Sequence, residues 1–233
     1  MCGYIQRVTD SPHVAALMRR IGLGELLEPL LVGGYNVEHF YPAFGGAVNR
    51  KIRGVIIEEN GEKKLINPTW WFDCSMGDEG LEVGKRTTFN ARNLDSPFWK
   101  GALRHHRAIV IATSIGESKF IDGKKHQFLM KGEAFILGAL YRKFDDDTYS
   151  CAVITRNSHP KFEPYHDKAF PLFLPPDESF IDIWLDKEVT QDPLIDELLD
   201  NPKLYPCLEV TRVKSYKSAQ KLGESILLDS DLT

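Results

Sequence analysis

A cysteine stands directly after the initiator methionine, in the sequence Met1-Cys2-Gly3. Cells remove the methionine when the second residue is small, and removal leaves an α-amine and a thiol on adjacent carbons of Cys2. Reference pKa values of about 7.7–8.0 for an α-amine and about 8.5 for a thiol make both groups partly nucleophilic near neutral pH. Such a 1,2-aminothiol attacks esters and amides, and it condenses with aldehydes to a five-membered thiazolidine. The alternative is an ordinary cysteine on a first strand, and acid–base partners elsewhere decide between the two.

Three later segments carry side chains that could assist such a nucleophile. Asn90-Ala91-Arg92 offers an amide for a developing oxyanion and a guanidinium that suits phosphate. The apolar stretch 107–112 leads to Glu117, and a carboxyl group at the mouth of a buried layer can act as a general acid or base. His166-Asp167-Lys168 joins a histidine, which titrates near neutral pH, to a nearby cation, and His159 is its nearest rival. Each segment alone also fits a structural role, such as a turn, an exposed loop carboxylate or a core histidine.

Taken in order along the chain, these segments resemble the SOS-response-associated peptidase (SRAP) family, whose members act on abasic sites in single-stranded DNA. The resemblance rests on joint order and spacing rather than on any one motif. Its further pieces are Tyr35-Asn36-Val37, Pro68-Thr69-Trp70-Trp71, Thr155 and Trp184-Leu185. The resemblance implies one domain over 1–233 with a partly barrel-like antiparallel sheet and flanking helices. It also implies single-stranded DNA with abasic sites as the partner, and neither a cofactor nor a metal.

The resemblance also assigns catalytic roles. The α-amine of Cys2 would form a Schiff base with the ring-opened sugar aldehyde, and its thiol would close the thiazolidine. Asn90 would orient the intermediate, Glu117 would be the general acid or base, and His166 would help to open the sugar and to reverse the link. Self-processing of the peptidase type is a further implied activity.

DNA contacts are implied at five positions, namely Asn36, Trp70, Trp71, Arg92 and Lys168. The two cations would hold phosphates, and the tryptophans would stack or wedge against bases, at about 1–3 kcal/mol per base. Without the family, at least one of the tryptophans is better explained by core packing.

This sequence departs from the family pattern near several of these residues. Tyr4 stands where the family usually has arginine, and Glu117 lacks the flanking aromatic residues. An acidic–threonine pair is replaced by Leu94-Asp95, and one extra residue precedes Pro171. We interpret the chain as a divergent member that keeps the residues of the chemistry.

Two other functions fit parts of the sequence. Glutamine amidotransferases with an N-terminal nucleophile also begin Met-Cys-Gly, but they require glutamine-pocket segments, and Asn60-Gly61 is typical of a hairpin turn. The other candidate is a non-catalytic relative that binds single strands or a protein partner. Crosslinking requires that Met1 is removed and that a covalent adduct forms with abasic DNA. The absence of an adduct would favour one of these two alternatives.

The elements that position these residues follow an α+β pattern of many strands and few helices. We expect strands over 2–7, 35–41, 52–59, 87–91, 107–113, 127–131, 134–141, 149–155 and 207–213. We expect helices over 12–22, 97–104, 176–185 and 193–199. Ser11 is the predicted cap of the first helix, with Pro12 at its first turn.

Composition limits the class of protein. The net charge of −4 argues against coating duplex DNA by charge alone, and the basic groups, including 104–107, are expected to be solvated. Apolar runs are too short to span a bilayer, so we expect a cytoplasmic monomer that joins the nucleoid when bound to DNA. The four cysteines are widely separated and offer no zinc-binding pair.

Overall fold

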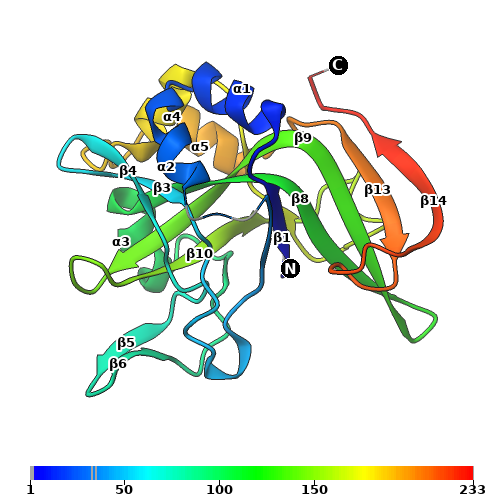
Figure 1. Ribbon diagram of the computed structural model, residues 1–233, viewed down its shortest axis with the longest axis horizontal. Helices are drawn as coiled ribbons and strands as arrows, with labels where there is room; N and C mark the ends of the chain where they lie inside the picture. The colour runs from blue at the N-terminus through cyan, green and yellow to red at the C-terminus, as the bar shows by residue number, and fades with distance from the viewer. Residues whose placement is uncertain (1–2, 33, 35, 233) are drawn as a thin grey trace.

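A large, mostly antiparallel sheet forms the centre of the protein in the computed structural model, which describes residues 3–32, 34 and 36–232 (Figure 1). Its main path runs in the order β11-β10-β9-β8-β1-β2. These strands are β1 (Ile5–Val8), β2 (Val37–Phe40), β8 (Arg107–Ile121), β9 (Lys124–Lys143), β10 (Tyr149–Arg156) and β11 (Phe170–Pro171). The strands that join this path are β3 (Val55–Glu59), β4 (Glu62–Ile66), β7 (Asn90–Ala91), β12 (Phe173–Leu174), β13 (Leu208–Val213) and β14 (Lys221–Leu228). A separate hairpin consists of β5 (Cys74–Gly77) and β6 (Gly80–Val83).

Two long strands, β8 and β9, hold the sheet together. They pair from Arg107 opposite Leu140 to Ile121 opposite Lys124, with a register shift between Ala112 and Ser114. A bulge of this kind bends a strand and increases its twist. Both strands therefore curve through the molecule, and the sheet has the shape of a half-barrel (Figure 1).

The helices lie on the outside of the sheet, most of them at one end of the molecule (Figure 1). They are α1 (Pro12–Arg20), α2 (Leu27–Leu31), α3 (Pro97–His105), α4 (Glu178–Leu185) and α5 (Pro193–Asp200), with the short 3₁₀ turns η1 (Gly24–Leu26) and η2 (Phe44–Gly46). The cap of α1 is as predicted, because the Ser11 hydroxyl accepts a hydrogen bond from the His13 N–H. None of the described helices is long and apolar enough to cross a membrane.

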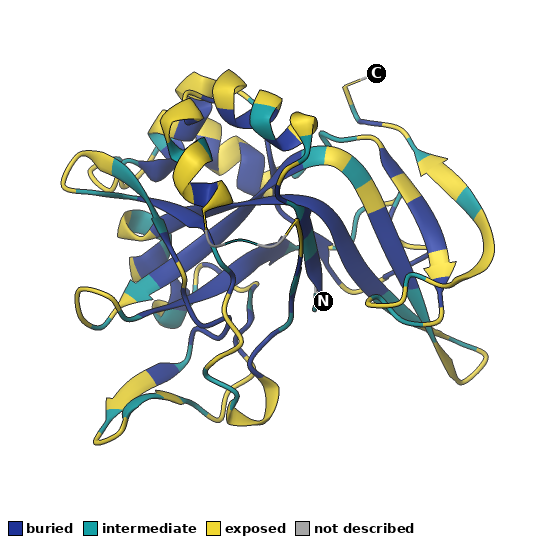
Figure 2. Ribbon diagram, viewed as in Figure 1, coloured by how far each residue is buried: buried dark blue, intermediate teal, exposed yellow. Residues whose placement is uncertain are grey.

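The strand β8 is buried on both faces at its start (Figure 2), and it lies between the two larger of the three hydrophobic clusters. Successive side chains of a strand point to opposite faces. Ala108 and Val110 accordingly belong to a cluster inside the half-barrel, whereas Ile109 and Ile111 belong to a cluster under the helices. Burial of both faces thus fixes the position of β8 and of the residues that follow this apolar stretch.

The α+β class with a strand-rich half-barrel core is confirmed, and the Asn60-Gly61 turn joins β3 to β4 with positive φ at both residues. Four expectations were wrong. The strand predicted over 107–113 continues to Ile121, the stretches 127–131 and 134–141 are one strand, and β14 follows the strand expected to be last. Arg107 is buried rather than solvated.

Candidate active site beside the first strand

The first strand enters the sheet between β2 and β8, directly beside Glu117. Ile5 lies opposite Ile115, and the Gly116 N–H donates to the Tyr4 carbonyl at 2.9 Å. Continued by two residues, this antiparallel register brings Gly3 opposite Glu117. Cys2 lies outside the described residues, but it is joined to Gly3, and consecutive Cα atoms are about 3.8 Å apart. The register therefore connects the predicted nucleophile to the segment that holds the predicted acid.

Glu117 is a buried carboxyl group, with a residue exposure of 1%. Burial raises its pKa above the ordinary value, because the charged form loses its hydration. Its Oε2 atom lies 3.6 Å from Nδ1 of His166, whose side chain is also nearly buried. The structure thus brings together two residues that are 49 positions apart in the sequence, and it gives the carboxyl group the direction of pKa shift that suits a general acid.

The ring of His166 is oriented by the backbone. Its Nδ1 atom lies 2.9 Å from the carbonyl oxygen of Ser118. A carbonyl oxygen only accepts hydrogen bonds, so Nδ1 must carry the proton in this contact. The neutral ring therefore has its lone pair on Nε2. This contact links the histidine to the same stretch of β8 that carries Glu117.

His159, the rival histidine, has a different environment. Its ring stacks on Phe170 with centroids 4.6 Å apart and an interplanar angle of 23°. Its Nε2 atom lies 3.1 Å from a carboxylate oxygen of Asp231. These contacts hold His159 against Phe170 and Asp231. His166 is therefore the one of these two histidines that contacts Glu117.

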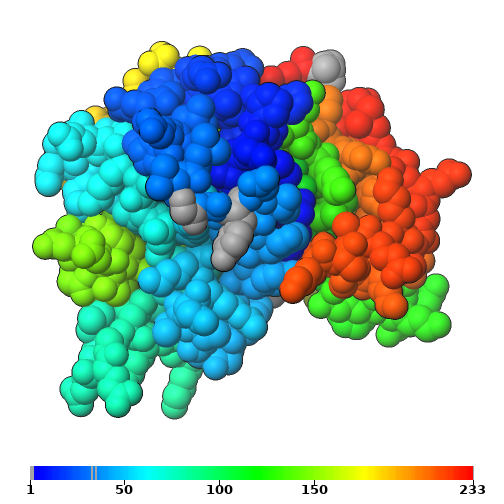
Figure 3. Space-filling view, viewed as in Figure 1, coloured from blue at the N-terminus to red at the C-terminus, as the bar shows by residue number. Residues whose placement is uncertain are grey.

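A tyrosine that the sequence analysis did not select covers the strand beside Glu117. The Tyr216 hydroxyl donates to the Glu117 carbonyl at 2.8 Å. Its ring packs on Gly116 so closely that a Cβ at this position would lie only 2.7 Å from the ring. The same ring stacks on Tyr4 with centroids 4.9 Å apart. Figure 3 shows the orange surface of the segment after β13 against the blue surface of the N-terminal part of the chain. An aromatic pair from distant segments thus stands beside the acid.

The family of the chain follows from its similarity to known proteins. The model of the family described as SOS response associated peptidase (SRAP) matches residues 1–217. The chain belongs to the SRAP family. Membership associates this SRAP protein with the response to DNA damage at the level of the family. No curated protein matches the chain.

Solved structures similar to this SRAP chain share its fold. A protein from Bacteroides thetaiotaomicron is 16% identical with a TM-score of 0.60, over 92% of this chain and 93% of that one. A protein from Bordetella bronchiseptica is 17% identical with a TM-score of 0.61, over 92% and 100% of the two chains. A phage-related protein from the same organism is 18% identical with a TM-score of 0.62, over 97% and 100%. At such identities the likeness establishes the fold alone.

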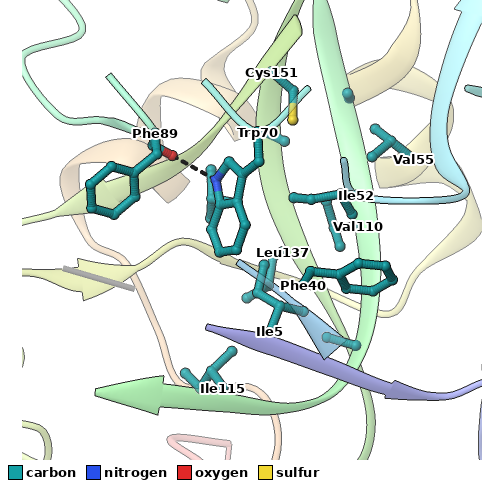
Figure 4. Close-up of a cluster of buried hydrophobic side chains, with 14 of the residues drawn as sticks. Ile5, Phe40, Ile52, Val55, Trp70, Phe89, Val110, Ile115, Leu137 and Cys151 are labelled. Carbon is teal, nitrogen blue, oxygen red and sulfur yellow. Dashed lines mark hydrogen bonds between the residues drawn. The ribbon is translucent and has the colours of Figure 1, made fainter. Parts of the chain in front are cut away.

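Asn90 lies on β7, which pairs in parallel with β10 so that Asn90 is opposite Val153. Its side-chain oxygen is buried. The neighbour of Asn90 in the sequence, Phe89, shares one hydrophobic cluster with Ile115 and with Tyr165, which precedes His166 (Figure 4). Each of the three predicted partners of Cys2 thus lies within two positions of a residue of this large cluster, and the contact between Glu117 and His166 joins two of them.

The two tryptophans occupy the core of the SRAP fold rather than its surface. Trp70 is fully buried, and its indole N–H donates to the Phe89 carbonyl at 2.9 Å (Figure 4). Trp71 is 5% exposed. Rings buried in this way offer no face to a base in this structure. Phe44, which is 49% exposed and meets Trp71 edge-on, is the aromatic side chain at the surface here.

The polar DNA-contacting residues expected of the SRAP chain are exposed. Arg92 and Lys168 lie on the surface, as does Asn36, whose carbonyl accepts from the Thr9 N–H. Arg92 lines a surface hollow together with Arg156. In the described part of the chain, no three His, Cys, Asp or Glu side chains gather as a metal site.

Proposed function

We propose that this protein traps abasic sites in single-stranded DNA as a covalent adduct of Cys2. The proposal takes the family's association with DNA damage and adds a reaction at a defined place. The observation that carries it is the pairing of buried Glu117 with His166 directly opposite the start of the chain. A carboxyl group with a raised pKa beside a histidine is the combination that proton transfer at a sugar aldehyde requires.

The proposed reaction begins when an abasic sugar opens to its aldehyde. The Cys2 α-amine adds to the aldehyde carbon, and the resulting carbinolamine loses its oxygen as water to leave a C=N bond. The Cys2 sulfur then adds to the carbon of that bond, the nitrogen takes up a proton, and the thiazolidine ring is closed. One water leaves overall, and no oxidation or reduction occurs.

The residues around Cys2 have separate parts in this scheme. Glu117 donates the proton that turns the departing oxygen into water, a role that a carboxyl group suits better when burial raises its pKa. His166 exchanges protons with the sugar oxygen as the ring opens and when the link reverses. Asn90 orients the intermediate through its amide. Arg92 and Lys168 hold flanking phosphates, and exposed Phe44 replaces the tryptophans as the ring on which a base stacks.

The test is a crosslinking assay with a labelled single strand that contains one abasic site. The processed protein should form an adduct that survives denaturation, and Cys2→Ala should abolish it. Cys207→Ala is the matched control, because Cys207 is an exposed free cysteine far along the chain. Binding of the strand without any adduct from protein that lacks Met1 would contradict the proposal and would favour a non-catalytic relative.

A further inference from the structure

The last described residues of the chain, 218–232, lie beyond the 1–217 that the family model matches. They form β14, which pairs with β13 at the edge of the sheet, and a short tail (Figure 1). The tail returns to the core of the protein, because the Asp231 N–H donates to the Leu204 carbonyl at 2.8 Å. The C-terminal segment of this chain is thus anchored on the rest of the fold.

Asp231 is the centre of that anchor. Its carboxylate accepts from the Leu204 N–H at 2.6 Å and from Lys161 Nζ at 2.7 Å, and it lies 3.1 Å from His159 Nε2. Burial alone would raise the pKa of Asp231, but the hydrogen bonds from Lys161 and Leu204 outweigh burial and lower it. The Lys161 ammonium also donates to the carbonyls of Asp229 and Ser230. The carboxylate is therefore ionised at neutral pH and ties the tail to the segment around His159.

That segment leads directly to His166. The His159 carbonyl accepts from the N–H of Phe162 at 2.8 Å, and the Phe162 carbonyl accepts from the His166 N–H at 2.7 Å. Phe162 itself is fully buried. Consecutive hydrogen-bonded turns of this kind make 159–166 one short rigid body, with the Asp231 contacts at its start and the His166 ring at its end.

We propose that Asp231 is a positioning residue for His166. By holding His159 and Lys161 it fixes the turns 159–166, and these keep Nδ1 of His166 on the Ser118 carbonyl and beside Glu117. The effect on the chemistry of the site rests on the proposed function, whereas the effect on the His166 ring does not.

The variants that test this are Asp231→Ala and the more conservative Asp231→Asn, which keeps the size of the side chain if the alanine variant is unstable. Asp229→Ala is the matched control. It removes the same charge two residues away, and Asp229 contributes to the anchor through its backbone carbonyl. All variants are made in the full-length protein.

The first readout is the tautomer of His166, measured from the ¹⁵N shifts of its two ring nitrogens and assigned with His166→Gln. The native protein and Asp229→Ala should show the proton on Nδ1, as the Ser118 contact requires. Asp231→Ala and Asp231→Asn should shift the ring toward the other tautomer and speed hydrogen exchange at the His166 amide. An unchanged ring in a folded Asp231 variant, or an equal change in Asp229→Ala, would overturn the proposal.

The second readout is the rate of adduct formation with abasic single-stranded DNA. A small misplacement of a catalytic group is costly, so we expect Asp231→Ala to be slower by about 10-fold and Asp229→Ala to equal the native protein. A native rate in a folded Asp231 variant would count against the positioning role. If the native protein itself forms no adduct, the proposed function fails, and the ring measurement still decides the role of Asp231.

Discussion

Glu117 has an environment that a stabilising residue would avoid. A buried carboxylate loses its hydration, which costs free energy, and its contact with His166 is an ion pair only when the histidine is protonated. The raised pKa of Glu117 is the measurable sign of this cost. We expect this cost in stability if Glu117 transfers protons as proposed.

Glu117→Gln should therefore stabilise the protein at high pH. A raised pKa in the folded state means that stability is fully present below the unfolded glutamate pKa of about 4.3 and is lost as the pH rises through the folded value. The glutamine variant keeps the shape without that loss. We expect its free energy of unfolding at pH 8 to exceed the native value, because the amide has no charged form whose burial would cost free energy.

The measurement is urea unfolding at pH 4 and at pH 8. The difference between Glu117→Gln and the native protein should shrink toward zero at pH 4, where the carboxyl group is protonated in both states. Glu79→Gln, at an exposed position, should show no such dependence. A glutamine variant that is the less stable protein at pH 8 would rule out this explanation.

At the scale of elements, one arginine joins two helices to the central strand. The buried guanidinium of Arg107, at the start of β8, donates to carbonyls near the C-terminal ends of α3 and α4, including Leu103 at 2.8 Å and Val189 at 2.7 Å. Burial lowers the pKa of Arg107 to about 10, so the group stays protonated at neutral pH. A planar group with five donors suits this set of acceptors.

Arg107→Ala should cost about 3 kcal/mol or more of unfolding free energy, because a hydrogen bond to a charged group contributes about 1.5–3 kcal/mol and several are lost. Arg107→Lys should recover little of the lost stability, since an ammonium lacks the planar fork of donors with which the guanidinium reaches carbonyls at the ends of two helices. Thermal unfolding followed by circular dichroism measures both. Lys100→Ala on the exposed face of α3 should stay near the native value, and a native-like melting temperature in Arg107→Ala would show that the carbonyls are satisfied without it.

Elements with strong local signals could be predicted from the sequence. Strands whose extent depends on pairing with a neighbouring strand could not. The start of α1 follows from Ser11 and Pro12, and the β3–β4 turn follows from Asn60-Gly61. The continuation of β8 beyond Thr113 was missed because its polar residues lack an alternating pattern, and pairing with β9 supplies the order instead. β14 was missed because its side chains are mostly exposed.

The site shows the same division. Glu117 and His166 were selected from the sequence, and the structure places them in contact. Tyr216 was not selected, because a lone tyrosine after a strand gives no local sign that its hydroxyl will reach a carbonyl 99 positions away. The family resemblance implied base contacts for Trp70 and Trp71, with core packing as the alternative for at least one of them, and the packing around Phe89 buries both.

At the scale of the whole molecule, charge sets how DNA can be held. With a net charge of −4, long-range attraction cannot supply the affinity, so local cations must contact the strand. In the proposed function this role belongs to exposed Arg92 and Lys168, on the segments that carry Asn90 and His166. We therefore expect modest affinity with a shallow dependence on salt.

Arg92→Ala should weaken binding of single strands of any sequence. Removing one phosphate contact should make the negative slope of log K against log salt shallower by about 0.7 for single-stranded DNA. Fluorescence anisotropy across a salt series measures this. Lys187→Ala, on the helical side of the molecule, should leave the slope unchanged. An unaltered slope in Arg92→Ala would mean that the single-stranded DNA does not contact Arg92.

The most direct test of the account identifies the crosslinked atoms. The native protein is reacted with abasic single-stranded DNA, treated with borohydride, digested with nuclease and protease, and analysed by mass spectrometry. We predict a peptide that begins at Cys2, lacks Met1 and carries the sugar remnant with the loss of one water, its mass unchanged by borohydride because a thiazolidine has no C=N bond to reduce. A remnant on a lysine, or an N-terminal peptide that keeps Met1 in an otherwise crosslinked protein, would contradict the account.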